Sequence, residues 1–555
     1  MTNLLRRFLG LCAAGAVGIA LAGDGVSAFE MAVPVWPEGR TMEENAFVGF
    51  RADFAVRKGE RPVLRVTGSS LYRAWVNGKF AGCGPARAGH GYFRVDEWPL
   101  EKLVQEGTNA VAIEVRAYNL FRQGINSIAV QPGFAEAEIA VEGDVRCATG
   151  RDFTCADVPN AKKVSRWSPH RGQIEAYRLD PKWDAWRTSP GFCGKKPARV
   201  SSVRLLDRVV SYPDFRILPG RTAFATAFSY DAVRAPARAE LEFDAKDVSD
   251  RIRGTKTAPL SAGTRFAPVS RGQGVIADFG GVRAGFCGLT VRCREPGTLW
   301  VFMDEMLTSG IVDPVRRTRY ATALACELKE PGEYRIEAFE ATALGVAHAV
   351  MTSGAAEVGG FYVREYVNPD VRAAAFRCSD PALERIFAAA QETCAQNTMD
   401  AQMDCPSRER MSCPCDGYYT LAGCNLLAGH HAVERLFFDC FRLSTNYCSH
   451  VPGRLPGMYP NSSADGGTAC IPNWNMFMAL QLERYVRETG DRRSAEALRE
   501  RMLETMETLK RSRNAEGLVE NVPGWVFVSW DRANGSTKGV NYPTVRQASL
   551  AELVN

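Results

Sequence analysis

The chain has 555 residues, of which 46% are hydrophobic and 24% are charged, and its formal net charge is +5. This length is too great for one hydrophobic core and predicts about three or four domains. Because the net charge is small for this size and the basic residues are scattered, nucleic acid is not an expected partner.

The first 28 residues have the three parts of a secretory signal peptide. Arg6 and Arg7 precede an apolar run over residues 8–22, and the small-residue segment 26–28 forms a cleavage site. Glycines interrupt the run and it is short for a membrane span, so a cleaved peptide is preferred over an anchor. We therefore expect residues 1–28 to be removed and the mature chain to be exported, either periplasmic or secreted, with no stable membrane span.

Residues 33–190 are expected to form a β-sandwich. Short runs with alternating apolar residues recur at residues 63–67, 72–76 and 111–116, separated by glycine-containing segments. Asn77-Gly78 follows the second run and predicts a tight hairpin, because both residues tolerate a positive φ.

Residues 200–365 are expected to form a second β-sandwich. Its clearest predicted strands lie at residues 289–293 and 299–302. Asp304 and Glu305 come just after the second of these runs. They could approach an active site, but a solvated strand end is the more ordinary explanation for acidic residues in that place.

The apolar period changes from two to 3.6 at Ser379. Asp380 is suited to cap a helix and Pro381 to occupy its first position. One apolar stripe follows at positions spaced by three or four residues, namely Leu383, Ile386, Phe387, Ala390 and Cys394. Further stripes begin at Trp474 and Ala495. We expect helical hairpins here, with these stripes in the core.

The densest cluster of charged residues is Asp-Cys-Pro-Ser-Arg-Glu-Arg at residues 404–410, followed by Asp416. Three carboxylates and two guanidiniums lie within thirteen positions, and Pro406 indicates a loop that leads into a helix. Paired carboxylates are what glycoside hydrolysis requires, whereas a solvated ion-pair network is the ordinary alternative. The two aspartates would raise the pKa of Glu409 and the neighbouring arginines would lower it, and the sequence leaves that balance open.

This motif resembles the signature of the bacterial α-L-rhamnosidases of glycoside hydrolase family 78. In that family an Asp-Cys-Pro-x-Arg segment leads to the catalytic acid and then to a further aspartate. By this resemblance Glu409 is the proton donor, Asp404 and Asp416 bind the sugar, and Arg408 binds a sugar hydroxyl or orients the acid. Other segments that resemble the family lie at residues 75–78, 84–87, 378–381, 455–460, 471–474 and 528–530. The last two contain Trp474 and Trp530, whose counterparts stack on sugar.

The resemblance implies a multidomain protein in which two β-sandwich domains precede an (α/α)6 toroid of the six-hairpin glycosidase type. A toroid of twelve helices takes roughly 300 residues or more. We therefore expect residues 371–555 to hold the first half of that domain, as in a C-terminally truncated family member. In the family the general base is a glutamate in the second half, so no base is assigned here.

The leading functional hypothesis is an exported glycoside hydrolase that cleaves terminal α-L-rhamnosyl linkages of an oligo- or polysaccharide by an inverting mechanism. The alternative is a non-catalytic glycan-binding protein or an inactive fragment without the general base. Many family members have Gly-Trp shortly after the Glu-Arg pair, where this chain has Met-Ser-Cys-Pro-Cys at residues 411–415. That departure favours the alternative, whereas Glu409 favours the enzyme.

The cysteines do not indicate a metal or cofactor site. The chain has 17 of them, and an exported protein could pair them in ways that the sequence does not reveal. Four of them raise the question of zinc: Cys405, Cys413, Cys415 and Cys424. Their spacing lacks paired Cys-x-x-Cys units, so buried thiols are the ordinary explanation. Neither a metal nor a cofactor is expected.

Overall fold

The computed structural model describes residues 29–119, 131–162, 164, 175–190, 192, 194–232, 243–318, 322–444, 455–461 and 471–519. The predicted signal peptide and Trp530 lie outside these ranges. In the described part of the chain, no helix is both long and apolar enough to cross a membrane.

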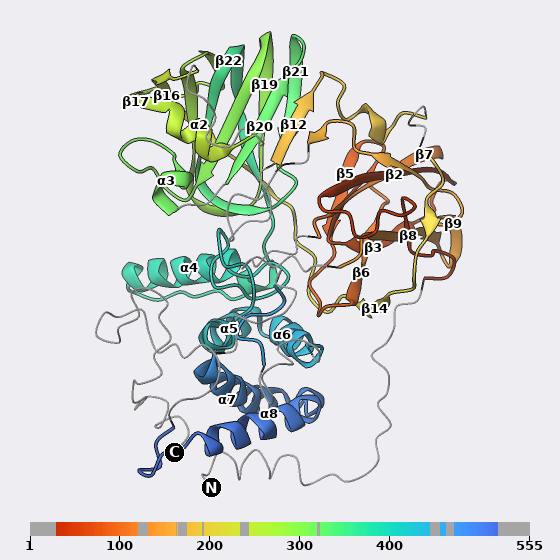
Figure 1. Ribbon diagram of the computed structural model, residues 1–555, viewed down its shortest axis with the longest axis vertical. Helices are drawn as coiled ribbons and strands as arrows, with labels where there is room; N and C mark the ends of the chain where they lie inside the picture. The colour runs from red at the N-terminus through yellow and green to blue at the C-terminus, as the bar shows by residue number, and fades with distance from the viewer. Residues whose placement is uncertain are drawn as a thin grey trace.

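The first sandwich consists of two sheets (Figure 1). One sheet has the order β13 (Ala198–Arg199), β1 (Val35–Trp36), β8 (Phe134–Val141), β3 (Pro62–Ser69), β6 (Tyr92–Pro99) and β14 (Arg204–Asp207), with β9 (Asp144–Ala148) paired to β8. The other has the order β10 (Thr154–Asp157), β2 (Ala46–Val56), β7 (Gly107–Ala117), β4 (Leu71–Val76) and β5 (Lys79–Gly84). Fully buried Trp36, Phe50 and Tyr72 belong to the core between them. Asn77 and Gly78 have positive φ and form the predicted turn between β4 and β5.

The second sandwich is built around two long, bent strands, β19 (Gln273–Asp304) and β22 (Thr342–Glu365), which pair along most of their length. The strand order is β11 (Ala161–Lys162), β12 (Glu175–Leu179), β20 (Ala323–Leu328), β19, β16 (Arg221–Tyr230) and β17 (Ile252–Pro259). β15 (Ile217–Pro219) and β18 (Phe266–Ser270) pair with β22, and β21 (Gly332–Glu337) pairs with β19. Two short helices, α2 (Ala245–Arg251) and α3 (Pro314–Thr318), contact each other; α2 also contacts β17, and α3 contacts β19 (Figure 1).

The chain passes between the two sandwiches more than once. After β10 it enters the second sandwich as β11 and β12, continues through η1 (Ala185–Arg187), and returns to the first sandwich as β13 and β14. The predicted limits of 33–190 and 200–365 assign one continuous segment to each sandwich, whereas the strand pairing shows that each sandwich contains strands from both sides of this division. They remain predictions.

The helices follow the second sandwich and stack below it in Figure 1. They are η2 (Asp370–Arg372), α4 (Pro381–Gln396), α5 (Pro414–Ala428), α6 (Ala432–Arg442), α7 (Pro472–Thr489) and α8 (Arg493–Arg511). Asp380 caps α4 as predicted, because its carboxylate accepts a hydrogen bond of 2.8 Å from the N–H of Ala382. The change from strands to helices falls between Glu365 and Pro381, where the apolar period changes.

The expectation that every apolar stripe faces a core is wrong for α4. Leu383 and Ile386 are 49% and 64% exposed, whereas Leu482 of α7 and Leu498 of α8 are fully buried. The buried residues of α4 are Ala395 and Gln396, at the end that meets α5, η2 and β19. Phe387 of the same stripe is half-buried and stacks on Phe376, with ring centroids 5.3 Å apart, so the stripe is covered only in part. Packing partners, and not the sequence period, decide whether an apolar face is buried.

Candidate active site

The signature motif lies in the loop between α4 and α5. α4 ends at Gln396 and α5 begins at Pro414, so residues 397–413 form the connection. We call residues 404–410 the signature loop. Pro414 occupies the first position of α5, and Asp416 lies in its first turn. The predicted loop that leads into a helix is therefore present, and the helix starts after the Glu-Arg pair.

Glu409 is held by its sequence neighbours. Its carboxylate accepts a hydrogen bond of 3.0 Å from Arg408, and its N–H donates to the sulfur of Cys405 at 3.3 Å. Burial and a hydrogen bond with the carboxyl group of Asp404 raise the pKa of Glu409 to about 7, although the charge of Arg408 opposes the shift. The balance that the sequence left open is thus decided by burial and by Asp404. Near neutral pH a substantial share of Glu409 carries a proton.

Asp416 is the third carboxyl group of the motif. Burial and the nearby charge of Asp404 raise its pKa to about 6. Asp404 therefore acts electrostatically on both of its partners in the motif. The structure brings Asp404, Arg408, Glu409 and Asp416 into one electrostatic cluster.

The cluster fits a proton donor better than a metal ion. Asp404, Cys405 and Glu409 each offer one ligand atom, and these atoms lie within 4.8 Å of one another. However, burial raises the pKa of the Cys405 thiol to about 12, so the thiol is protonated at neutral pH. A divalent ion would have to displace the protons of this thiol and of Glu409 in order to bind here.

The end of β19 reaches the signature loop. The hydroxyl of Ser407 donates a hydrogen bond of 2.6 Å to Glu305, the residue that follows β19. Asp304 is only 5% exposed and binds the guanidinium of Arg317, with an Nε–Oδ2 distance of 2.8 Å. The interpretation as a solvated strand end is therefore wrong for Asp304, whereas the side chain of Glu305 remains 34% exposed. Their position directly after an apolar strand was the sequence signal for an approach to the site.

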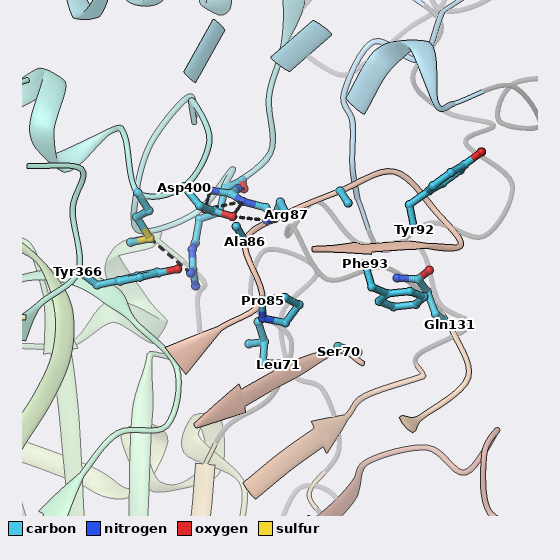
Figure 2. A pocket seen from close by; sticks show the side chains of 13 residues that line it. Ser70, Leu71, Pro85, Ala86, Arg87, Tyr92, Phe93, Gln131, Tyr366 and Asp400 are labelled. Carbon is cyan, nitrogen blue, oxygen red and sulfur yellow. Dashed lines mark hydrogen bonds and ion pairs between the residues drawn. The ribbon is translucent and has the colours of Figure 1, made fainter. Parts of the chain in front are cut away.

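Arg87 and Asp400 form an ion pair beside the signature loop (Figure 2). The sequence motifs gave neither residue a role in the site. Arg87 follows β5 in the first sandwich, and its Nε lies 2.8 Å from Asp400 Oδ1. Although burial opposes it, the charge of Arg87 lowers the pKa of Asp400 to about 2. Residues 84–87 belong to a segment that resembles the family, but nothing in the sequence indicates a partner more than 300 positions away.

A cavity of about 640 Å³, including its opening to solvent, lies next to this ion pair (Figure 2). Leu71, Pro85 and Phe93 line it from the first sandwich, and Tyr366 and Arg410 line it from the other side. Arg410 directly follows Glu409 in the chain, but Glu409 does not line the cavity. The cavity is thus a feature of the junction between the first sandwich and the signature loop.

The structure describes only one of the two tryptophans that were predicted to stack on sugar. Trp474 lies in the first turn of α7, and its side chain is half-buried. Trp530 lies outside the described residues. The convergence of these two side chains with Glu409 on one surface stays a prediction.

Comparison with known proteins shows what this arrangement resembles. Residues 371–555 match the family model of the bacterial alpha-L-rhamnosidase 6 hairpin glycosidase domain. No curated protein matches the chain. The C-terminal third of the chain is therefore similar to this domain of the bacterial α-L-rhamnosidases, and the resemblance seen in the sequence is confirmed.

Solved structures extend the likeness of fold to the sandwiches. The GH78 family rhamnosidase of Bacillus sp. GL1 has a TM-score of 0.70 and 14% identity, over 90% of this chain and 71% of that chain. The α-L-rhamnosidase of Aspergillus terreus has a TM-score of 0.54 and 16% identity, over 91% of this chain and 54% of that chain. The α-L-rhamnosidase of Streptomyces avermitilis, solved with L-rhamnose, has a TM-score of 0.55 and 16% identity, over 87% of this chain and 43% of that chain. The predicted fold class, two β-sandwiches followed by part of an (α/α)6 toroid, is confirmed.

Proposed function

We propose that this chain acts as an exported glycoside hydrolase on terminal α-L-rhamnosyl linkages, by inversion and with Glu409 as the general acid. The observation that carries the proposal is the place of Glu409 in the signature loop, held by Arg408 and Cys405, where burial and Asp404 raise its pKa to about 7. A general acid is most effective when its pKa lies near the working pH. Glu409 meets this condition in a loop whose sequence and fold resemble those of the rhamnosidases.

The proposed reaction assigns each group one task. The proton of Glu409 moves to the glycosidic oxygen as the bond between that oxygen and the anomeric carbon breaks. Water attacks the anomeric carbon from the opposite face, and its proton passes to a second carboxylate. Asp404, Arg408 and Asp416 hold sugar hydroxyls in this scheme, and Trp474 and Trp530 stack on the sugar.

No residue is assigned as the second carboxylate. In inverting glycosidases it stands about 6.5–9.5 Å from the acid, which leaves room for water. Arg317 pairs with both acids at the end of β19, but Glu305 is the better candidate, because its side chain is 34% exposed whereas that of Asp304 is 4% exposed. Glu305→Gln is therefore the first variant to examine if the chain hydrolyses its substrate.

The test of the acid uses aryl α-L-rhamnosides with good and poor leaving groups. Glu409→Gln keeps the shape of the side chain but removes the proton, so hydrolysis of the substrate with a poor leaving group should fall by about 10²- to 10⁴-fold. The substrate with a good leaving group should be affected less, because its oxygen leaves without protonation. Glu500→Gln is the matched control, since the Glu500 side chain is 77% exposed. An equal loss for both substrates, or retention of anomeric configuration, would contradict the proposal.

A second candidate function is a glycan-binding protein without hydrolytic activity. It is favoured by Met411 and Cys413, which occupy the segment where many family members have Gly-Trp and are 0% and 2% exposed. This chain therefore presents no aromatic ring to a sugar from those positions. Calorimetric binding of L-rhamnose together with no turnover of either aryl rhamnoside would support this function over the enzyme.

Export belongs to the same proposal and rests on residues 1–28 of the sequence. The test is N-terminal sequencing of the protein recovered from outside the cytoplasm. A mature chain that begins just after Ala28 would support export, and an intact Met1 in cytoplasmic protein would contradict it.

A further inference from the structure

Arg87 is fixed within the first sandwich before it reaches the signature loop. Its side chain is 10% exposed, and its carbonyl oxygen accepts a hydrogen bond of 3.0 Å from Nε of Arg94. Arg94 also donates to the carbonyl of Asp207, the last residue of β14, at 2.6 Å. The backbone that carries Arg87 is therefore anchored to the sandwich.

The guanidinium of Arg87 binds Asp400 across the domain junction. Nε and Nη2 lie 2.8 and 2.5 Å from Asp400 Oδ1, and the backbone N–H of Arg87 donates to Oδ2 at 2.6 Å. The Asp400 side chain is 5% exposed, so the ion pair is shielded from water. A planar guanidinium gives such a contact a fixed direction that an ammonium group does not.

The same guanidinium also holds the backbone of the signature loop. Its Nη1 donates to the carbonyl oxygen of Arg410, the residue after Glu409. The side chain of Arg410 in turn donates to the carbonyl of Ala341 in the second sandwich at 2.7 Å. Residue 410 is thus fixed through its backbone by one sandwich and through its side chain by the other.

We propose that Arg87 is a positioning residue for Glu409, so that the first sandwich sets the geometry of the acid through the backbone of Arg410. This inference rests on the proposed role of Glu409 as the general acid. Arg87 acts through Arg410 and Asp400 and does not itself take part in proton transfer. If the contact is lost, the signature loop relaxes, water reaches Glu409, and its pKa falls from about 7 toward the ordinary value for glutamate.

Arg87→Lys tests the inference in the full chain, because lysine keeps the charge but loses the planar fork. Arg65→Lys is the matched control: Arg65 pairs with Glu138 at 2.9 Å and Glu97 at 3.1 Å, all within the first sandwich. Hydrogen exchange read by mass spectrometry should become faster in residues 405–411 by on the order of tenfold in Arg87→Lys. The control should leave these residues unchanged.

A second measurement reports on the acid itself and does not require turnover. A water-soluble carbodiimide with an amine activates protonated carboxyl groups, and peptide mass spectrometry gives the labelling of Glu409 between about pH 4 and 8. The midpoint should fall by about one pH unit in Arg87→Lys and stay in place in Arg65→Lys. A merely structural role would leave this midpoint unchanged.

The outcomes separate the inference from the proposed function. Unchanged exchange, or faster exchange with an unchanged midpoint, overturns the positioning role of Arg87. If Arg87→Lys does not fold, Asp400→Asn replaces it, and the same two shifts are expected. Hydrolysis of an aryl α-L-rhamnoside is measured in parallel: its absence from the unmodified chain contradicts the proposed function, while exchange and labelling still decide the role of Arg87.

Discussion

Two residues close to Glu409 in the chain shift its pKa in opposite directions. Arg408 stabilises its ionised form, and Asp404 stabilises its protonated form. Because both groups are close neighbours in sequence, their types alone do not fix the direction of the pKa shift. Burial of the carboxyl group tips the balance, and burial depends on how the loop packs against the sandwiches.

Activity should therefore fall as the pH rises through about 7, because Glu409 then loses the proton that it must donate. In Asp404→Asn the fall should occur at lower pH, since a nearby charge that raises the pKa of Glu409 is removed. The measurement is the pH profile of kcat/KM. Asp144→Asn is the control, with a side chain that is 69% exposed. A profile that is identical in Asp404→Asn and the unmodified chain would contradict this interpretation.

The same pKa predicts a change in stability. A carboxyl group whose pKa is raised on folding stabilises the folded state below about pH 4.5, and this contribution is lost as the pH rises through about 7. Glu409→Gln cannot ionise, so it should become more stable relative to the unmodified chain by about 1–3 kcal/mol between these pH values. We set this range below the free energy that the full pKa shift would give, because the Glu409 side chain is 27% exposed and solvent screens its charge. Urea unfolding at both pH values measures the difference, and a pH-independent difference would refute the prediction.

At the scale of single residues, sequence separation decides what could be predicted. Asp404, Arg408 and Glu409 lie within six positions, so their mutual contact follows from the motif. Glu305 and Ser407 are 102 positions apart, and Arg87 and Asp400 are 313 positions apart. These contacts form only when the domains pack together, and a single sequence carries no direct sign of them.

Three helices meet around a buried carboxylate, that of Glu434 on α6. It is 0% exposed and accepts hydrogen bonds from Asn425 of α5 at 2.6 Å, Gln481 of α7 at 3.0 Å and Arg484 of α7 at 2.8 Å. The carboxylate therefore holds two neighbouring helices to α6. A buried charge of this kind is stable only while its partners are present.

Arg484→Met should lower the free energy of unfolding by about 3–5 kcal/mol, because it leaves the charge of Glu434 buried without its cation. Arg487→Met is the control on the same helix. Arg487 is 61% exposed and faces Glu483 one turn earlier, so its loss should cost less than about 0.5 kcal/mol. Urea unfolding of both variants measures the two costs. Similar small losses in both would show that Glu434 is not a strong support of the helix packing.

At the scale of elements, the apolar period predicted where helices form but not whether another element packs against their apolar faces. Leu482 of α7 and Leu498 of α8 are buried as expected, whereas Leu383 and Ile386 of α4 are exposed. A period of 3.6 shows only that one face of a helix is apolar. Whether another element lies against that face is a property of the tertiary arrangement.

The second sandwich and the helices share one apolar cluster. Phe286 of β19 and Ala341 before β22 pack in it with Met399 and Met403 of the loop and with Cys424 of α5. All five are less than 5% exposed. The helical part is therefore partly covered by the second sandwich.

Residues 371–555 produced alone should expose their half of this cluster. We expect that fragment to bind a hydrophobic dye and to aggregate, whereas residues 29–555 stay monodisperse under the same conditions. Dye fluorescence and light scattering measure the difference. Equal behaviour of the two proteins would show that the helices pack independently of the sandwich.

The path of the chain through the two sandwiches restricts how such a protein can be recombined. A gene fusion placed just after β10 would leave β13 and β14 of the first sandwich in the other parent. A fusion placed just after β14 would carry β11 and β12 of the second sandwich along with the first. No single crossover point between β10 and β15 transfers one sandwich with all of its described strands. The two sandwiches are therefore inherited as a pair, and functional chimaeras in this region should require exchange of residues 35–365 as one cassette.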